Sequence, residues 1–180
     1  MSSSTASPKL LLTGPPKVGK STAINRLVQL LREHGLVVDG FVTHEQREHG
    51  RRVGFVVHDL AGPEAVMAHQ DYATDVRVGR FGVDVPTFER VGLPALRRAL
   101  DQGSIVVVDE IARMELASEP FVKLVEEVMT GWAPVVASVH LQAHPFTDAL
   151  KRRADVEVVS LTLDNRDTMP AQLLKRLTAP

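Results

Sequence analysis

Glycine, lysine and serine residues near the amino end of the chain are spaced as in loops that bind phosphate groups. Residues Gly14 to Ser21 read GPPKVGKS and fit the pattern G-x-x-x-x-G-K-[ST]. In such a loop, backbone N–H groups and the start of the next helix face the anion. We predict that Lys20 reaches the β- and γ-phosphates and that the Ser21 hydroxyl holds Mg²⁺. The sequence therefore predicts a site for a nucleoside triphosphate.

Two adjacent carboxylates follow an apolar run later in the chain. Asp109 and Glu110 come directly after Ile105 to Val108, which predicts a buried strand that ends in acidic residues. We expect Asp109 to hold Mg²⁺, directly or through water, and Glu110 to orient or deprotonate an attacking water. By itself this pattern is weak, but together with the upstream loop it favours a catalytic site. Glu110 and Lys20 are thus the predicted catalytic residues, and Ser21 and Asp109 the predicted Mg²⁺ ligands.

Sequence patterns of the regulatory GTPases are missing. No [NT]-K-x-D occurs in the sequence, and the run from Asp109 to Ala112 lacks the glycine of a D-x-x-G switch. We therefore do not expect a signalling GTPase.

Several arginines are further candidates for contacts with phosphate. Arg47 and Arg52 flank a predicted turn and could close over the triphosphate as a lid, although a solvated hairpin tip explains such residues equally well. Arg51 is a weaker candidate for the same role. Arg113 could face the phosphates or pair with Glu115 on the surface. The sequence leaves these alternatives open.

Histidines and aromatic residues suggest little further chemistry. The 7 histidines form no metal-binding set, and His140 could sense the γ-phosphate or be a structural residue. The basic cluster Lys151 to Arg153 is typical of a solvated helix face, although it could also bind an acceptor nucleotide or RNA phosphate. Trp132 and Tyr72 provide no stacking platform, so nucleic-acid binding is not expected.

Strand and helix patterns alternate along the chain, which predicts an α/β fold with a mainly parallel central sheet flanked by helices. A polar turn at 45–52 lies between two β-like runs and predicts an antiparallel hairpin insertion. Pro94 is expected to start a compact helix. The predicted strands are 9–13, 36–42, 65–69, 75–81, 104–109, 134–140 and 156–161, and the predicted helices are 20–34, 95–100, 118–129, 147–153 and 166–177.

Composition favours one soluble domain. The chain has 180 residues, is 44% hydrophobic, has a formal net charge of −1 and contains no cysteine. We expect a loose tail at 1–7 and a single P-loop NTPase domain at 8–180. The absence of a long apolar run and of cysteine favours a cytoplasmic protein without a membrane partner. Protein partners are unknown from the sequence.

Beyond single motifs, the chain resembles the THEP1-type nucleoside-triphosphatase family, small P-loop enzymes related to nucleotide kinases. The resemblance runs from about Lys9 to Leu177. It rests on the ordered segments Gly14–Thr22, Gly40–Arg47 with Arg51–Phe55, Gly79–Val85, Asp109–Leu116 with Ser118 and Phe121, and Asn165–Asp167. The chain departs from the family at Lys17 and Ala112, where the family usually has glycine.

The resemblance implies Mg²⁺-dependent hydrolysis of ATP, GTP and other triphosphates to diphosphate and phosphate, slowly and with broad base tolerance. A small-molecule kinase or a nucleotide-dependent switch protein is the alternative. Residues that the resemblance implies in nucleotide binding are Gly14, Pro15, Pro16, Lys17, Val18, Gly19, Lys20, Ser21, Thr22, Val106, Val107, Val108, Asp109, Glu110, Ile111, Ala112 and Arg113.

Overall fold

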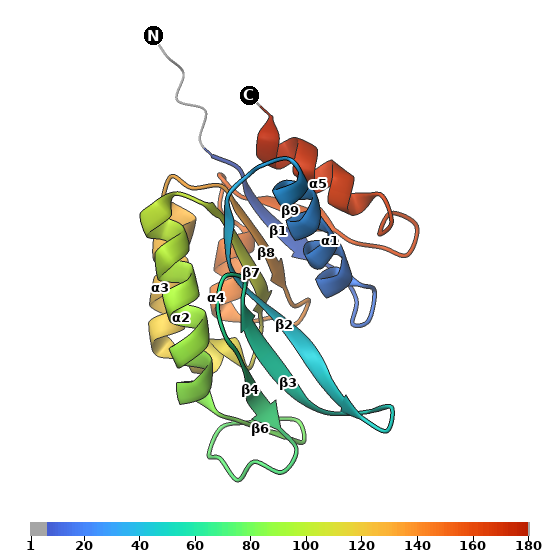
Figure 1. Cartoon of the computed structure of the whole chain (residues 1–180), viewed down its shortest axis with the longest axis vertical. Coiled ribbons are helices and arrows are strands. Elements are labelled where there is room, and N and C mark those ends of the chain that lie inside the picture. Colours follow the sequence, from blue (N-terminus) through green and yellow to red (C-terminus); the bar gives the residue numbers. More distant parts are fainter. Residues whose placement is uncertain (1–6, 180) are drawn as a thin grey trace.

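The computed structural model describes residues 7–179, in which one twisted sheet is covered by helices on both faces (Figure 1). The predicted tail therefore lies outside the described residues, except for Ser7. Its helices and strands are β1 (Lys9–Thr13), α1 (Lys20–Glu33), β2 (Val38–Glu48), β3 (Arg51–Asp59), β4 (Glu64–His69), β5 (Arg77–Val78), β6 (Phe81–Val83), α2 (Val85–Gln102), β7 (Ile105–Ile111), the 3₁₀ helix η1 (Glu115–Ala117), α3 (Glu119–Thr130), β8 (Val135–Val139), α4 (Pro145–Lys151), β9 (Glu157–Ser160) and α5 (Met169–Thr178).

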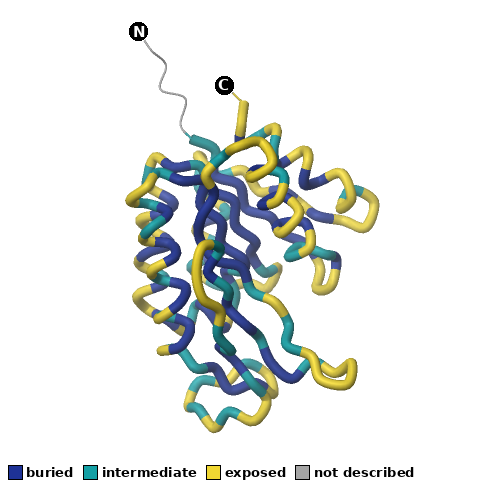
Figure 2. Tube along the Cα trace, viewed as in Figure 1, coloured by how far each residue is buried: buried dark blue, intermediate teal, exposed yellow. Residues whose placement is uncertain are grey.

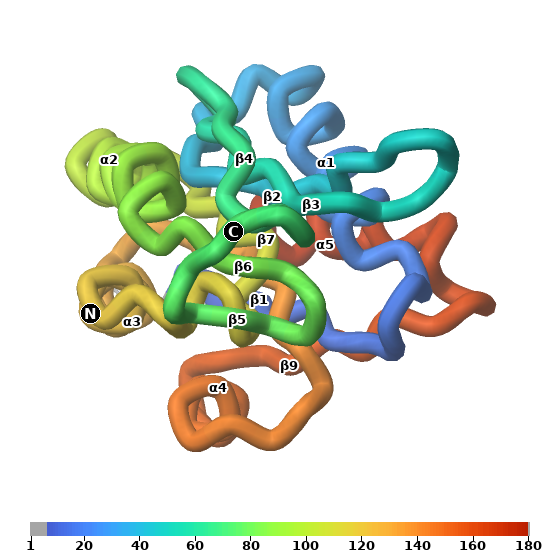
Figure 3. The backbone as a smooth tube through the Cα atoms, turned by 90° about the horizontal axis from the view of Figure 1, so that it is seen from below, coloured from blue at the N-terminus to red at the C-terminus, as the bar shows by residue number. Residues whose placement is uncertain are grey.

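The sheet has a parallel half and an antiparallel half. Its strand order is β5-β6-β4-β3-β2-β7-β8-β1-β9. Pairs from β2 to β9 are parallel, and pairs from β5 to β2 are antiparallel. The predicted α/β architecture with a hairpin insertion is thus confirmed. Figure 3 looks onto the edge where the parallel strands end, with the β1–α1 loop, the β2–β3 hairpin and the β5–β6 segment around it.

Each face of the sheet has its own hydrophobic core. Helices α1 and α5 cover one face, where Ile24, Leu27 and Leu173 are fully buried. Helices α2, α3 and α4 cover the other face, where the rings of Phe41, Phe88 and Phe121 pack edge to face or tilted against one another. Burial is continuous through the central strands and ends along the hairpin (Figure 2). The parallel strands are therefore held rigidly from both sides, which fixes the loops at their carboxyl ends.

Helix α2 differs from the prediction. The expected helix at 95–100 is wrong at its start, because α2 begins at Val85, and Pro94 lies inside it. The helix begins where the Asp84 side chain accepts a hydrogen bond from the Thr87 backbone N–H at 3.0 Å, and Pro86 occupies the first turn, where proline is tolerated. Pro94 is exposed, so the carbonyl that it leaves unpaired can be solvated.

Smaller boundary differences occur elsewhere. The predicted last helix, 166–177, is found at Met169–Thr178, and the predicted strand 75–81 is found as the short strands β5 and β6. Helix α3 begins as expected, because the Ser118 side chain accepts from the Phe121 backbone N–H at 3.1 Å. Within residues 7–179, no helix is long and apolar enough to cross a membrane.

A buried ion cluster joins α2 to the sheet. The Arg98 guanidinium donates to the carboxylates of Asp39 on β2 and Asp59 on β3, at 2.6 and 3.1 Å. Both aspartate side chains are only 5% exposed. The cluster holds the parallel half, the hairpin and one helix layer in a fixed arrangement.

At the opposite edge from the β1–α1 loop, Trp132 covers the end of α2. Gly103 ends this helix with φ 64°, and a Cβ there would lie 2.1 Å from the indole ring. Both the positive φ and the nearby indole therefore favour glycine at this position. The indole itself is 72% exposed.

Candidate functional site

The loop between β1 and α1 has the shape of an anion site. Gly19 precedes the first turn of α1 with φ 108°, a conformation that favours glycine, and offers no side chain to cap that turn. The first backbone N–H groups of α1 are therefore available to a ligand. Pro15, Pro16 and Lys17 are exposed, while Val18 is buried and anchors the loop.

Lys17 adopts a left-handed conformation. Its φ is 65°, which costs free energy in any residue other than glycine. Glycine, which the family resemblance implies at this position, would adopt the same φ without strain. The Lys17 side chain is exposed and adds a positive charge to the loop.

Lys20 connects the loop to the acidic strand end. Its Nζ donates to the Gly14 carbonyl at 3.3 Å and lies 3.7 Å from the Glu110 Oε1. The structure thus brings together the two residues that sequence analysis assigned to catalysis. The Lys20 side chain remains 13% exposed.

Asp109 is fully buried in β7. The Ser138 hydroxyl on β8 donates to its Oδ1, whereas its Oδ2 has no hydrogen-bond partner among residues 7–179. Burial raises the pKa of the Asp109 carboxyl, and the hydroxyls of Ser138 and Ser21 and the Lys20 ammonium oppose that shift. A buried carboxylate oxygen without a donor, on a carboxyl group that the Ser21 hydroxyl also approaches, fits the oxygen ligands that Mg²⁺ prefers.

Glu110 lies at the surface end of the same strand. Its side chain is 27% exposed. Burial raises the pKa of the Glu110 carboxyl, the Lys20 ammonium lowers it, and the neighbouring Asp109 charge raises it again. A carboxylate that is partly buried and has a raised pKa is suited to accept a proton.

Sequence analysis missed two buried polar residues near these carboxylates. Ser138 is a polar residue within the apolar strand β8, and this break in the strand pattern was the available indication. Glu115 was considered only as a surface partner of Arg113, but its side chain is buried and accepts from the Ala112 backbone N–H at 3.2 Å. Burial and the charges of Glu110 and Asp109 raise the pKa of Glu115 to about 8.

The arginines are not gathered at the loop. Arg47 and Arg52 both donate to the Glu45 carboxylate, at 2.9 and 2.7 Å. Arg52 also lies over the Phe55 ring, 5.2 Å from its centroid. Arg113 is exposed. In this structure the guanidinium groups of Arg47 and Arg52 therefore stabilise the hairpin, and their closure over a nucleotide stays a prediction.

The remaining candidates have structural surroundings. Val106, Val107 and Val108 are at most 1% exposed, so their side chains pack in the core. The His140 Nε2 lies 3.2 Å from the Thr147 hydroxyl. Burial, and next the Lys151 ammonium, lower the pKa of His140. Across the described part of the chain, no group of three or more metal-binding side chains is found.

The sheet order and the loop between β1 and α1 are those of the P-loop NTPase fold of the α/β class. A family model described as NTPase matches residues 9–174. The chain therefore belongs to this family, the nucleoside-triphosphatases of the THEP1 type.

Individual relatives are similar over almost their whole length. A nucleoside-triphosphatase THEP1 of Thermofilum pendens is 39% identical, with 97% of each chain covered. The crystal structure of THEP1 from Aquifex aeolicus superimposes with a TM-score of 0.85 at 30% identity and covers 94% of this chain and 99% of its own. The solution structure of a human cancer-related nucleoside triphosphatase gives 0.83 at 31% identity, with 96% and 98% covered.

Proposed function

We propose that this protein hydrolyses nucleoside triphosphates to the diphosphate and phosphate. The observation that carries the proposal is the meeting of Lys20, Asp109 and Glu110 at the uncapped start of α1. The relatives' printed names support the same activity. Nothing in the comparisons favours a kinase or a switch protein.

The chain's own residues divide the work as follows. Backbone N–H groups of the loop and of the first α1 turn bind the β-phosphate, and the Lys20 ammonium neutralises charge that develops on the β- and γ-phosphate oxygens. The Glu110 carboxylate orients a water toward the γ-phosphorus, opposite the leaving oxygen, and accepts its proton. Phosphate leaves with the water oxygen, and the diphosphate keeps the bridging oxygen.

Mg²⁺ is the expected cofactor, held by Ser21 and by the free Oδ2 of Asp109. Bound there, the ion would neutralise phosphate charge. Ser138 fixes the other oxygen of Asp109, so the carboxylate cannot rotate freely. We also propose slow turnover and broad base tolerance, as the family resemblance implies. The tolerance is supported by the chemistry of Lys20, Asp109 and Glu110, which suits phosphate and Mg²⁺ rather than a base.

Replacing Glu110 by Gln tests the proposed base. The amide keeps the size of the side chain but cannot accept a proton, so turnover should fall by about a hundredfold or more. Affinity for Mg²⁺ and ATP, measured by calorimetry, should be retained. Released phosphate and diphosphate are measured with several triphosphates and should match one for one, with or without added nucleosides.

Two further variants make this test decisive. Glu126→Gln removes an exposed carboxylate on α3 and should leave turnover unchanged. Lys20→Ala should weaken both binding and turnover. Loss of ATP affinity in Glu110→Gln would show that Glu110 is a ligand or structural residue, and unchanged kinetics in Lys20→Ala would disprove the site.

A further inference from the structure

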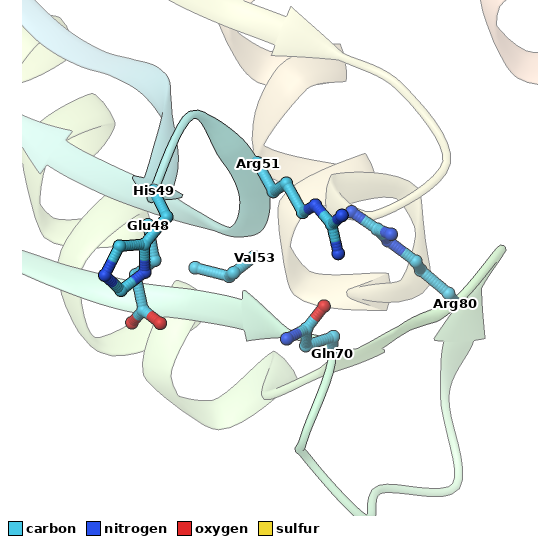
Figure 4. Close-up of a pocket in the computed structure, with 6 residues that line it drawn as sticks. All are labelled: Glu48, His49, Arg51, Val53, Gln70 and Arg80. Atoms are coloured by element: carbon cyan, nitrogen blue, oxygen red, sulfur yellow. The ribbon is translucent and has the colours of Figure 1, made fainter.

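A cavity lies away from the β1–α1 loop. Its volume is about 440 Å³, and of its lining residues only Arg51 was considered for the triphosphate, as a weaker candidate for the lid. The lining comes from the tip of the β2–β3 hairpin and from the segments beside β4 and β6 (Figure 4). The lining residues are Glu48, His49, Arg51, Val53, Gln70 and Arg80.

Two arginines meet at one end of this cavity. Figure 4 shows the guanidinium groups of Arg51 and Arg80 turned toward each other, with the Gln70 amide beneath them. Two positive charges that converge repel each other unless an anion lies between them. Guanidinium groups bind phosphate oxygens with paired hydrogen bonds, and an amide can add another donor. This end of the cavity therefore has the chemistry of a phosphate site.

The Arg80 side chain is held in place by several contacts, which favours ligand binding. It donates to the Arg52 carbonyl, and its guanidinium lies 5.1 Å from the centroid of the Phe81 ring. The Arg77 guanidinium in turn donates to the Arg80 carbonyl at 2.7 Å. Because Arg80 is already ordered, a ligand would lose less conformational entropy on binding there.

Arg51 has no carboxylate partner within the described residues. The nearby Glu45 is occupied by Arg47 and Arg52. Glu48 is opposite Arg51 in the strand register, yet its carboxylate lies with His49 at the other end of the cavity (Figure 4). The Arg51 charge is therefore available to a ligand.

The two ends of the cavity differ in chemistry. Arginines line one end, the Glu48 carboxylate lies at the other, where it can serve as a hydrogen-bond acceptor, and Val53 lies between them. A volume of about 440 Å³ exceeds that of a single phosphate ion and suits a small organic ligand. An inorganic anion alone would leave the Glu48 end unused.

We propose that this cavity binds a small phosphate monoester that carries hydroxyl groups. The phosphate lies between Arg51 and Arg80, and the hydroxyls donate to Glu48. A sugar phosphate and a nucleoside monophosphate share this chemistry. The site is separate from the triphosphate site and does not depend on the function proposed above.

Calorimetry with ribose 5-phosphate, AMP, adenosine and inorganic phosphate tests the proposal. The full chain is titrated in the presence of saturating ADP and Mg²⁺, so that the β1–α1 loop is occupied. Ribose 5-phosphate should bind saturably, and adenosine, which lacks the phosphate, should not. Binding by AMP as well would identify nucleoside monophosphates as ligands, whereas its failure beside ribose 5-phosphate would restrict the site to sugar phosphates.

Matched variants decide where the ligand binds. Arg51→Gln and Arg80→Gln should each weaken ribose 5-phosphate binding by about tenfold or more, because each removes a charged hydrogen bond. Arg97→Gln, at an exposed arginine on α2 outside both sites, should change nothing. Lys20→Ala should also retain binding, which separates this site from the triphosphate site.

Several results would overturn the proposal. These are a linear titration with ribose 5-phosphate, equal binding by wild type and Arg51→Gln, or competition by ADP. Inorganic phosphate binding as tightly as ribose 5-phosphate would disprove the role given to Glu48. Circular dichroism of Arg80→Gln shows whether lost binding reflects lost folding, and Arg51→Gln, at an exposed residue, gives an independent answer.

Discussion

A hydrogen bond from Ser138 holds the carboxylate of Asp109 in its orientation at the site. The Ser138 hydroxyl is its donor within the sheet, and both residues are fully buried. Ser138→Ala should lower the free energy of unfolding by about 1–3 kcal/mol, because the buried carboxylate loses one of its hydrogen-bond donors. The Mg²⁺ concentration for half-maximal ATP hydrolysis should also rise.

Ser104 offers a matched control for this prediction. Ser104 directly precedes β7. Its hydroxyl is also buried and has no hydrogen-bond partner among the described residues. Ser104→Ala should therefore leave stability and the Mg²⁺ dependence nearly unchanged in urea unfolding and steady-state assays. Equal effects of both substitutions would show that Ser138 acts only by filling space.

Glu115 makes stability depend on pH. Burial raises its pKa from 4.5 to about 8, so between these pH values the folded protein keeps a proton that the unfolded chain has lost. The free energy of unfolding should thus fall with rising pH in this window, by at most about 1.4 kcal/mol per pH unit. Glu115→Gln, which cannot ionise, should reduce this slope in urea unfolding between pH 5 and 9. Parallel slopes in the two proteins would contradict the assignment.

At the scale of elements, α2 contains a residue that weakens it. Pro94 removes one helical hydrogen bond, and Pro94→Ala should raise the free energy of unfolding by about 1 kcal/mol after the gain in unfolded-state entropy is subtracted. Pro86→Ala, in the first turn, should give no such gain. Thermal unfolding followed by circular dichroism compares the two variants, and destabilisation by Pro94→Ala would mean that the ring makes needed contacts.

Where sequence analysis located the end of a helix correctly, a residue at that end determines it. Gly19 starts α1, Ser118 caps α3 and Gly103 ends α2, and each acts through local backbone geometry. The start of α2 was missed because its cap, Asp84, lies far before Pro94, which reads as a helix start. The local sequence pattern does not show that α2 tolerates Pro94 in its interior.

The site residues also fall into those that the sequence predicts and those that only the fold brings together. Lys20, Ser21, Asp109 and Glu110 were predicted because they belong to contiguous motifs. Arg51 and Arg80 meet only because the antiparallel strands return beside each other, so no local pattern could join them. Long-range pairing of this kind is set by tertiary packing.

For the whole molecule, Arg98 connects helix, hairpin and parallel sheet. Arg98→Met would leave Asp39 and Asp59 buried without their cation and should lower the free energy of unfolding by about 3 kcal/mol or more. Arg97→Met removes only an exposed pair with Glu127 and should change stability little. Urea unfolding measures both, and similar small losses would show that the cluster contributes no net stability.

The position of Trp132 determines what fluorescence can report. It is the single tryptophan of the sequence, and its exposed indole covers Gly103 at the edge opposite the β1–α1 loop. Its emission in the folded protein should already resemble that of an indole in water. Nucleotide binding should therefore leave the emission wavelength unchanged, and unfolding should shift it little, so that an optical assay of either event needs an added chromophore nearer the loop.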